Sequence, residues 1–107
     1  MYSKSYIENF FLNLTLNTQI NPKHELSWGF YFKNDDIKAL KKAKKILLAQ
    51  GYNFAEIVEE NKEFYLHIEK IEIHNINSLY KRCVELTALT KKLDINCFDG
   101  FDVEKQQ

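Results

Sequence analysis

The chain has 107 residues, of which 45% are hydrophobic, and fifteen lysine and arginine residues balance fifteen aspartate and glutamate residues. This length predicts one compact domain, and the hydrophobic fraction is sufficient for a buried core. The zero net charge excludes a whole-molecule attraction to nucleic acid or to an anionic membrane. Any such attraction has to come from a local patch.

The cysteine content and the hydropathy of the sequence indicate the cellular compartment of the protein. Cys83 and Cys97 are the only cysteines, and two at this spacing predict neither a disulfide framework nor a metal-binding knuckle. No stretch is apolar for long enough to span a bilayer, and the first residues lack the pattern of an export signal. We therefore expect a cytoplasmic protein with reduced thiols and no membrane association.

The N-terminal part of the sequence predicts a helix and then a strand. Between Ser5 and Leu16, apolar residues recur at spacings of three and four, as on one face of an amphipathic helix. The polar segment 17–22 ends this pattern. Residues 25–32 then alternate between the two faces of a strand. One face holds four large apolar side chains, those of Leu26, Trp28, Phe30 and Phe32.

A second helix and a hairpin follow. Residues 34–36 are good N-terminal caps, apolar residues at helical spacing continue to Leu47, and Gly51 is expected to end the helix in the left-handed conformation. Residues 52–60 and 64–73 are rich in aromatic and β-branched side chains. They predict two strands joined by a short polar link.

The last part predicts a long helix capped near residues 75–77 and a short strand at 96–98. The whole order is that of an α+β, ferredoxin-like split βαβ sandwich (βαββαβ), with an antiparallel sheet, two helices on one face and an added N-terminal helix. We divide the single domain 1–107 into a helix and connection (1–22), a ferredoxin-like core (23–103) and a tail (104–107) that is expected to fray.

No set of residues predicts catalysis, a metal or a cofactor. His24, His67 and His74 lack the spacing of metal ligands. Cys83 and Cys97 have no base partner, so inert thiols are expected. Nothing assembles a nucleophile, a base and oxyanion donors, and we therefore do not expect an enzyme.

RNA binding is a separate hypothesis, based on the lysines at 38–45 and on aromatic residues of the sheet. Lysines are also typical of the solvated face of a helix. Ferredoxin-like domains that bind RNA stack bases on aromatics of the third strand, but residues 63–68 lack the accompanying basic and glycine residues. We therefore do not expect direct nucleic-acid binding. We assign Phe64, Leu66 and Ile68 to the core and Tyr65, His67 and Glu69 to the open face.

Acidic residues gather in the predicted hairpin. They are Glu56, Glu59, Glu60, Glu63, Glu69 and Glu72. A negative surface of this kind suits a basic protein partner, whose association it would steer. A solvated hairpin without a partner is the alternative interpretation.

The segment 98–103, Phe-Asp-Gly-Phe-Asp-Val, has no obvious role in a chain end. Asp99-Gly100 is expected to form a tight turn. In one interpretation Phe98 and Phe101 pin the tail to the helix layer or to the sheet edge. In the other, an exposed Phe101 and Asp102 belong to a partner-binding patch. Both can hold if one ring faces inward and the other outward.

This aromatic-Asp-Gly-aromatic run after the last helix, together with the order of elements, resembles the regulator of ribonuclease E activity B family of bacterial inhibitory proteins. In that family the motif is usually Tyr-Asp-Gly-Trp, and here residues 98–101 keep Asp-Gly and replace both aromatics. The resemblance covers residues 25–103. It implies a small cytoplasmic protein that binds a ribonuclease and lowers its activity without cutting anything.

The expected partner is therefore a protein. A ribonuclease is the first hypothesis, a toxin nuclease neutralised by an immunity protein is the alternative, and an RNA-binding module is the third. The expected partner-binding residues are Glu56, Glu59, Glu60, Asp99, Phe101 and Asp102. The sequence does not specify the oligomeric state.

Overall fold

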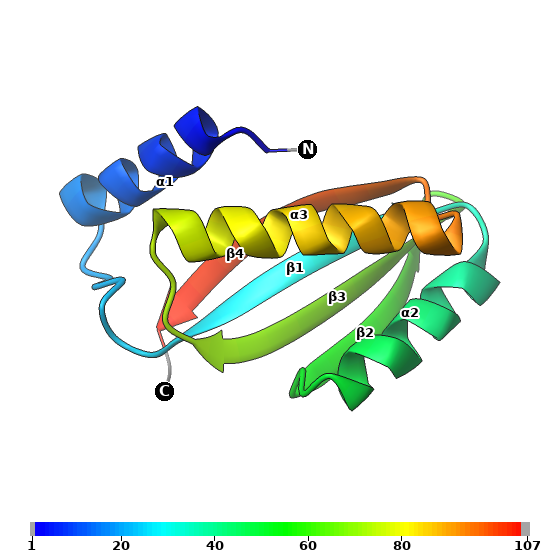
Figure 1. Cartoon of the computed structure of the whole chain (residues 1–107). Helices are drawn as coiled ribbons and strands as arrows, with labels where there is room; N and C mark the ends of the chain where they lie inside the picture. Colours follow the sequence, from blue (N-terminus) through cyan, green and yellow to red (C-terminus); the bar gives the residue numbers. More distant parts are fainter. Residues whose placement is uncertain (1, 106–107) are drawn as a thin grey trace.

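The computed structural model describes residues 2–105. In this part of the chain three helices and four strands follow one another in the predicted order (Figure 1). They are α1 (Lys4–Asn17), β1 (Leu26–Asn34), α2 (Ile37–Ala49), β2 (Phe54–Glu60), β3 (Glu63–Glu72), α3 (Ile76–Leu93) and β4 (Cys97–Lys105).

The four strands form one antiparallel sheet in the order β2-β3-β1-β4. Figure 1 shows α2 and α3 lying across one face of this sheet, with α1 beside α3 near the β4 edge. The prediction of a ferredoxin-like βαββαβ sheet with an added N-terminal helix is therefore confirmed.

The core lies between the helices and the inner face of the sheet. Trp28, Phe30 and Phe32 of β1 are 0% exposed, as the alternation of their strand predicts. Leu66 and Ile68 of β3 lie beside them in the core. Large apolar groups on the two central strands thus determine which face the helices cover, because burying them supplies most of the favourable free energy of folding.

Local signals set the ends of several elements. Asp36 caps α2 by accepting from the Lys38 amide, and Asn75 caps α3 in a reciprocal capping box with Ser78. Gly51 follows α2 with a φ of 98°, as predicted. The link between β2 and β3 is shorter than predicted, because Glu63 already belongs to β3.

The last strand differs from the prediction in length and in shape. β4 extends over Cys97–Lys105, and Asp99-Gly100 forms a bulge inside it instead of a tight turn. Its pairing with β1 shifts between Tyr31 and Phe32, so Asp99 has no partner residue, and Gly100 takes a φ of 148° that favours glycine. Continued pairing satisfies backbone groups that a turn would leave to solvent.

The tail also follows this strand further than predicted. Glu104 and Lys105 pair with Ser27 and Leu26, so the prediction of fraying from residue 104 is wrong for these two residues. Residues 106–107 lie outside the described part of the chain.

Aromatic rings hold α1 against β4. The Phe101 ring lies 5.3 Å from that of Tyr2 and 4.9 Å from that of Phe10, measured between centroids. The Phe98 ring lies 5.9 Å from that of Tyr2, in an edge-to-face arrangement. The interpretation of Phe101 as a pin to the helix layer is therefore confirmed, and the helix that it contacts is α1, whereas Phe98 contacts Tyr2, which precedes this helix.

We predict that Phe101→Ala loosens α1. Phe101 is half-buried, so the free energy of unfolding should fall by about 2 kcal/mol, less than the roughly 3–5 kcal/mol of a fully buried phenylalanine. Denaturant unfolding measures this change, and hydrogen exchange of α1 amides should quicken. Phe54→Ala is the matched control, because Phe54 is 37% exposed on an edge strand. An equal cost for the two variants would contradict this role of Phe101.

Candidate protein-binding face

The second face of the sheet has no helix over it in the described part of the chain (Figure 1). Strand alternation and register decide which side chains reach this open face. In one row across the sheet Glu56 is followed by His67, Tyr31 and Gly100, and in the next Phe54 is followed by Glu69, Gly29 and Asp102. Val58 and Ile71 add exposed apolar surface.

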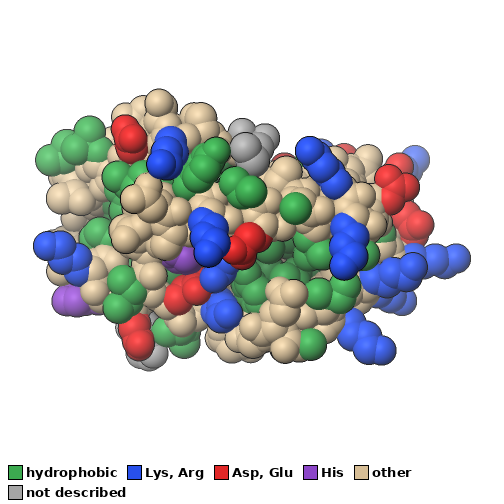
Figure 2. Space-filling model, in the orientation of Figure 1, with side chains coloured by type: hydrophobic (Ala, Val, Ile, Leu, Met, Phe, Trp, Pro, Cys, Tyr) green, Lys and Arg blue, Asp and Glu red, His purple; other side chains and the backbone are tan. Residues whose placement is uncertain are grey.

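The open face carries mostly negative charge. Its strand positions hold six carboxylates, those of Glu56, Glu60, Glu63, Glu69, Asp102 and Glu104. The one lysine at these positions is Lys33, whose Nζ lies 3.3 Å from the Glu63 carboxylate. The helix side is different, since lysines stand out on the right of Figure 2, where α2 lies in Figure 1. The zero net charge of the chain therefore hides a polarised surface.

A polar and aromatic cluster occupies the centre of the open face. The Tyr31 hydroxyl donates to Asp102 Oδ2 at 2.7 Å, and the Tyr31 ring stacks on His67 with centroids 4.5 Å apart. The Ser27 hydroxyl donates to Glu69 Oε1 at 2.9 Å, and His67 Nε2 lies 3.2 Å from Glu69 Oε2. These contacts fix the orientation of two carboxylates at the surface.

Gly29 makes this arrangement possible. A Cβ atom at position 29 would overlap Asp102 Oδ1 and would lie 3.1 Å from His67 Nε2. Only a residue without a side chain lets the groups from β3 and β4 close over β1. A glycine inside a strand weakens that strand, so its presence here marks a close approach of neighbouring groups.

The cluster also changes the acidity of Tyr31. Burial raises the pKa of Tyr31, and the hydrogen bond to the Asp102 carboxylate raises this pKa further. The hydroxyl therefore stays protonated and keeps donating to Asp102.

In the described part of the chain, no group of three His, Cys, Asp or Glu side chains is placed to hold a metal ion.

The structure distributes the six predicted partner-binding residues over several surfaces. Glu56 and Asp102 share the open face, although on opposite edge strands. Glu60, at the end of β2, also lies on the open face, because it is opposite Glu63. Glu59 lies toward the helix side, because it is opposite the inward-facing Phe64. Asp99 is in the bulge of β4 and Phe101 lies under α1. Binding by these residues stays a prediction.

Sequence reasoning overlooked Gly29, Ser27 and Tyr31 as members of a site. They lie on the strand face opposite Trp28 and Phe30, and His67 and Glu69 lie on the open face, as predicted. The glycine within an alternating strand was the available signal. The position of Gly29 in the sequence could not show which side chains approach it, because Asp102 is distant in the sequence.

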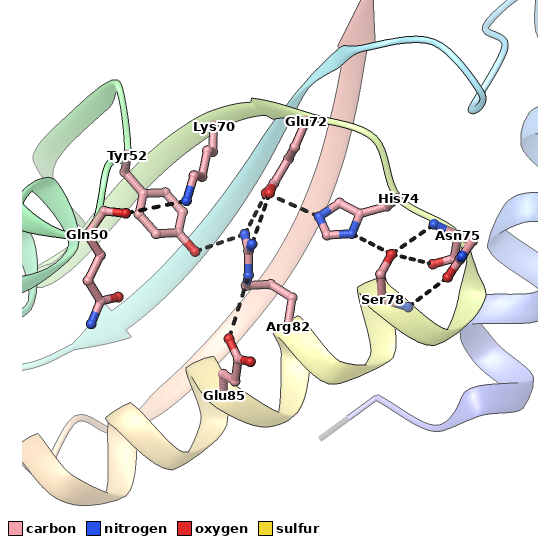
Figure 3. Close-up of polar contacts among 9 residues, drawn as sticks. All are labelled: Gln50, Tyr52, Lys70, Glu72, His74, Asn75, Ser78, Arg82 and Glu85. Atoms are coloured by element: carbon pink, nitrogen blue, oxygen red, sulfur yellow. Dashed lines mark hydrogen bonds and ion pairs between the residues drawn. The ribbon is translucent and has the colours of Figure 1, made fainter.

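A second polar network lies on the helix side of the sheet (Figure 3). The guanidinium of Arg82, the single arginine of the chain, donates to both oxygens of Glu72 at 2.5 and 2.9 Å and to the Tyr52 hydroxyl at 3.0 Å. His74 Nε2 lies 3.1 Å from Glu72 Oε1. This network joins α3 to the end of β3, so we interpret it as structural.

Glu72 is held ionised by these partners. Burial favours the neutral acid, but hydrogen bonds from His74 and Arg82 outweigh it and lower the pKa of Glu72 to about 2. The Arg82 guanidinium also lies 5.6 Å from the centre of the Phe30 ring. The ion pair is thus packed against the hydrophobic core.

The hollows of the described surface do not resemble an active site. One of about 670 Å³ lies between α1 and the start of α3, with Phe11, Thr15, Ile73 and His74 among its lining residues. The His74 ring nitrogens face Glu72 and Ser78, and Thr15 donates to the Phe11 carbonyl within its own helix. Ser78 Oγ lies 2.9 Å from His74 Nδ1, but the same hydroxyl closes the capping box of α3 by bonding to the Asn75 backbone, so we interpret this pair as structural.

A ferredoxin-like domain whose sheet has one open, acidic face has the geometry of a small binding protein. The family described as regulator of ribonuclease activity B matches residues 9–103, and the chain belongs to this family. It is therefore a non-catalytic regulator of ribonuclease activity. A comparison with curated proteins finds no match.

Two of the predictions drawn from the resemblance are thereby confirmed, namely the family and the absence of catalysis. The toxin-immunity alternative gains no support from this match. No helix within residues 2–105 has the length and apolar character that a membrane crossing requires.

We predict that Glu72 makes the fold sensitive to acid. The pKa of Glu72 is lowered from 4.5 to about 2 on folding, so its stabilising contribution is complete above pH 4.5 and is lost as the pH falls toward 2. Glu72→Gln should lower the free energy of unfolding at neutral pH by up to about 3 kcal/mol and flatten its acid dependence. Thermal unfolding from neutral pH down to pH 2 measures both effects.

Glu85→Gln is the control for this prediction. The Glu85 side chain is 56% exposed and its Oε2 lies 3.9 Å from Arg82 Nε. Its removal should leave the acid dependence almost unchanged. An unaltered acid profile in Glu72→Gln would show that other carboxylates cause the loss of stability.

A second prediction concerns the bond between Tyr31 and Asp102. Asp102→Asn removes the negative charge that holds the Tyr31 proton, so the pKa of Tyr31 should fall toward its ordinary value of 10.0. Ultraviolet absorbance of tyrosinate during an alkaline titration should then show one tyrosine ionising earlier than in the parent protein. Glu59→Gln, on the other side of the sheet, should leave the titration unchanged. A parent-like titration of Asp102→Asn would contradict the bond.

Proposed function

We propose that the chain regulates its ribonuclease by binding it directly, through the open face of the sheet. The observation that supports this proposal is the charge of that face, whose strand positions hold six carboxylates and one lysine. Proteins that process RNA contact its phosphates with basic surfaces. An acidic face complements such a surface and accelerates the encounter between the two proteins.

The proposed contact is centred on Glu56 and Asp102. Glu60 extends it at the end of β2, and Asp99 extends it along the edge of β4, whereas Glu59 faces the helix side and lies outside this contact. Phe101 contributes indirectly, because its ring holds α1 against the sheet. The exposed apolar side chains of Val58 and Ile71 lie on the same face and add surface to bury on binding.

Regulation by this route requires no chemistry from the chain. An acidic face bound to a basic surface of the ribonuclease blocks access of RNA to that surface, or shifts the enzyme to a less active conformation. A cytoplasmic location is part of the proposal, since the reduced thiols and the ribonuclease partner both fit it.

Affinity capture tests the proposal. The tagged chain is incubated with lysate of its own source, with and without added nuclease, and captured proteins are identified by mass spectrometry. We expect a ribonuclease that is retained after nuclease treatment and whose RNA cleavage slows as purified chain is added. Capture of nuclease-sensitive ribonucleoproteins alone would favour an RNA-binding module, and capture of a toxin nuclease would favour an immunity protein.

We predict that reversing charge on the open face slows association. The double variant Glu56→Lys, Asp102→Lys should reduce the association rate with the captured ribonuclease at least about tenfold at low salt, with a smaller effect at high salt. Surface plasmon resonance measures the rates. The matched control, Glu8→Lys with Asp35→Lys, changes two exposed carboxylates outside the sheet strands. An equal loss in both double variants would contradict binding through the open face.

A further inference from the structure

At the centre of the open face the side chains of Tyr31, His67, Glu69 and Asp102 gather around Gly29, and we call this group the socket. Glu69 of β3 and Asp102 of β4 stand opposite Gly29 in one row across the sheet. Because Gly29 has no side chain, the Asp102 carboxylate and the His67 ring lean over the β1 backbone. The row therefore brings acceptor groups from both neighbouring strands toward one point on the surface.

The two carboxylates of the socket are oriented, but no lysine or arginine neutralises them. Asp102 Oδ2 accepts from Tyr31, while Oδ1 accepts no hydrogen bond within residues 2–105. Glu69 contacts Ser27 and His67. Within the same residues, no lysine or arginine lies at ion-pair distance from Asp102 or Glu69. Asp102 Oδ1 thus has acceptor capacity left for an external cation.

A flat aromatic surface borders these acceptors. The Tyr31 and His67 rings are nearly parallel, with 13° between their planes, and the Phe54 ring meets His67 edge-on at 5.3 Å. A guanidinium group is planar, donates a fork of hydrogen bonds and stacks on aromatic rings. An ammonium group is compact and strongly hydrated, so it gains less from such a surface.

We propose that this socket binds one arginine side chain of the ribonuclease. This inference rests on the proposed function. Its guanidinium donates to Asp102 and Glu69 and stacks against the Tyr31–His67 pair. An arginine taken up here is no longer available to an RNA phosphate, which connects recognition to inhibition. Asp102 is thereby a specificity-determining residue, and the absence of a side chain at Gly29 lets the Asp102 carboxylate and the His67 ring approach each other.

A titration with small probes tests the socket in the full chain. The probes are three Gly-Ser peptides that are identical except for one central residue, which is arginine, lysine or citrulline. Amide and side-chain chemical shifts of the isotopically labelled chain report binding. We expect the arginine peptide to shift Gly29, Tyr31, His67 and Asp102, the lysine peptide to bind several-fold more weakly, and uncharged citrulline to leave these signals unmoved.

Two variants separate a socket from a general negative surface. Asp102→Asn should weaken binding of the arginine peptide about tenfold, while Glu60→Gln, with the same charge change at the end of β2, should have little effect. Glu69→Gln serves as a second socket variant, and the amide spectrum verifies the fold of each. Equal weakening by Asp102→Asn and Glu60→Gln, or equal binding of the arginine and lysine peptides, would overturn the socket.

The same variants distinguish failure of the socket from failure of the proposed function. If the arginine peptide binds at Gly29 but Asp102→Asn and Glu56→Lys leave ribonuclease binding unchanged, the socket stands and the proposed contact face fails. If Glu56→Lys weakens ribonuclease binding but the arginine peptide moves none of the socket signals, the contact face stands and the socket fails.

Discussion

The alternation of β1 determines the rest of the structure. Leu26, Trp28, Phe30 and Phe32 point to one side, and their burial requires a layer of helices there. The positions between them hold Ser27, Gly29, Tyr31 and Lys33, which are too small or too polar to attract a second layer. β1 is a central strand, so its two faces also set the faces of β3 and β4 through the register.

This division explains how a chain of zero net charge can present a charged surface. Basic residues concentrate on the helices. Carboxylates occupy positions on the open face of β2, β3 and β4. The helix layer is joined to the sheet by the ion pair of Arg82 and Glu72 and by aromatic contacts between α1 and β4. These contacts fix the helices against one face of the sheet, and the proposed contact with the ribonuclease uses the opposite face.

The fold was predictable because period-two and helical patterns are local properties of the sequence. The length of β4 was not, because Asp99-Gly100 suits a turn and a bulge equally well, and only pairing with β1 selects the bulge. The socket was not predictable either, since Gly29 and Asp102 meet through the sheet register. Arg82 was conspicuous as the single arginine of the chain, but its partner Glu72 depended on tertiary packing.

The most direct test of the account is hydroxyl-radical footprinting of the chain alone and bound to its ribonuclease. Side-chain oxidation of Phe54, Tyr65, His67 and Ile71 reports the open face, and that of Leu48, Tyr80 and Val84 reports the helix layer. Binding through the open face predicts that the first set is protected from oxidation and that oxidation of the second set is unchanged. Protection of the helix layer, with the sheet face still oxidised, would contradict it.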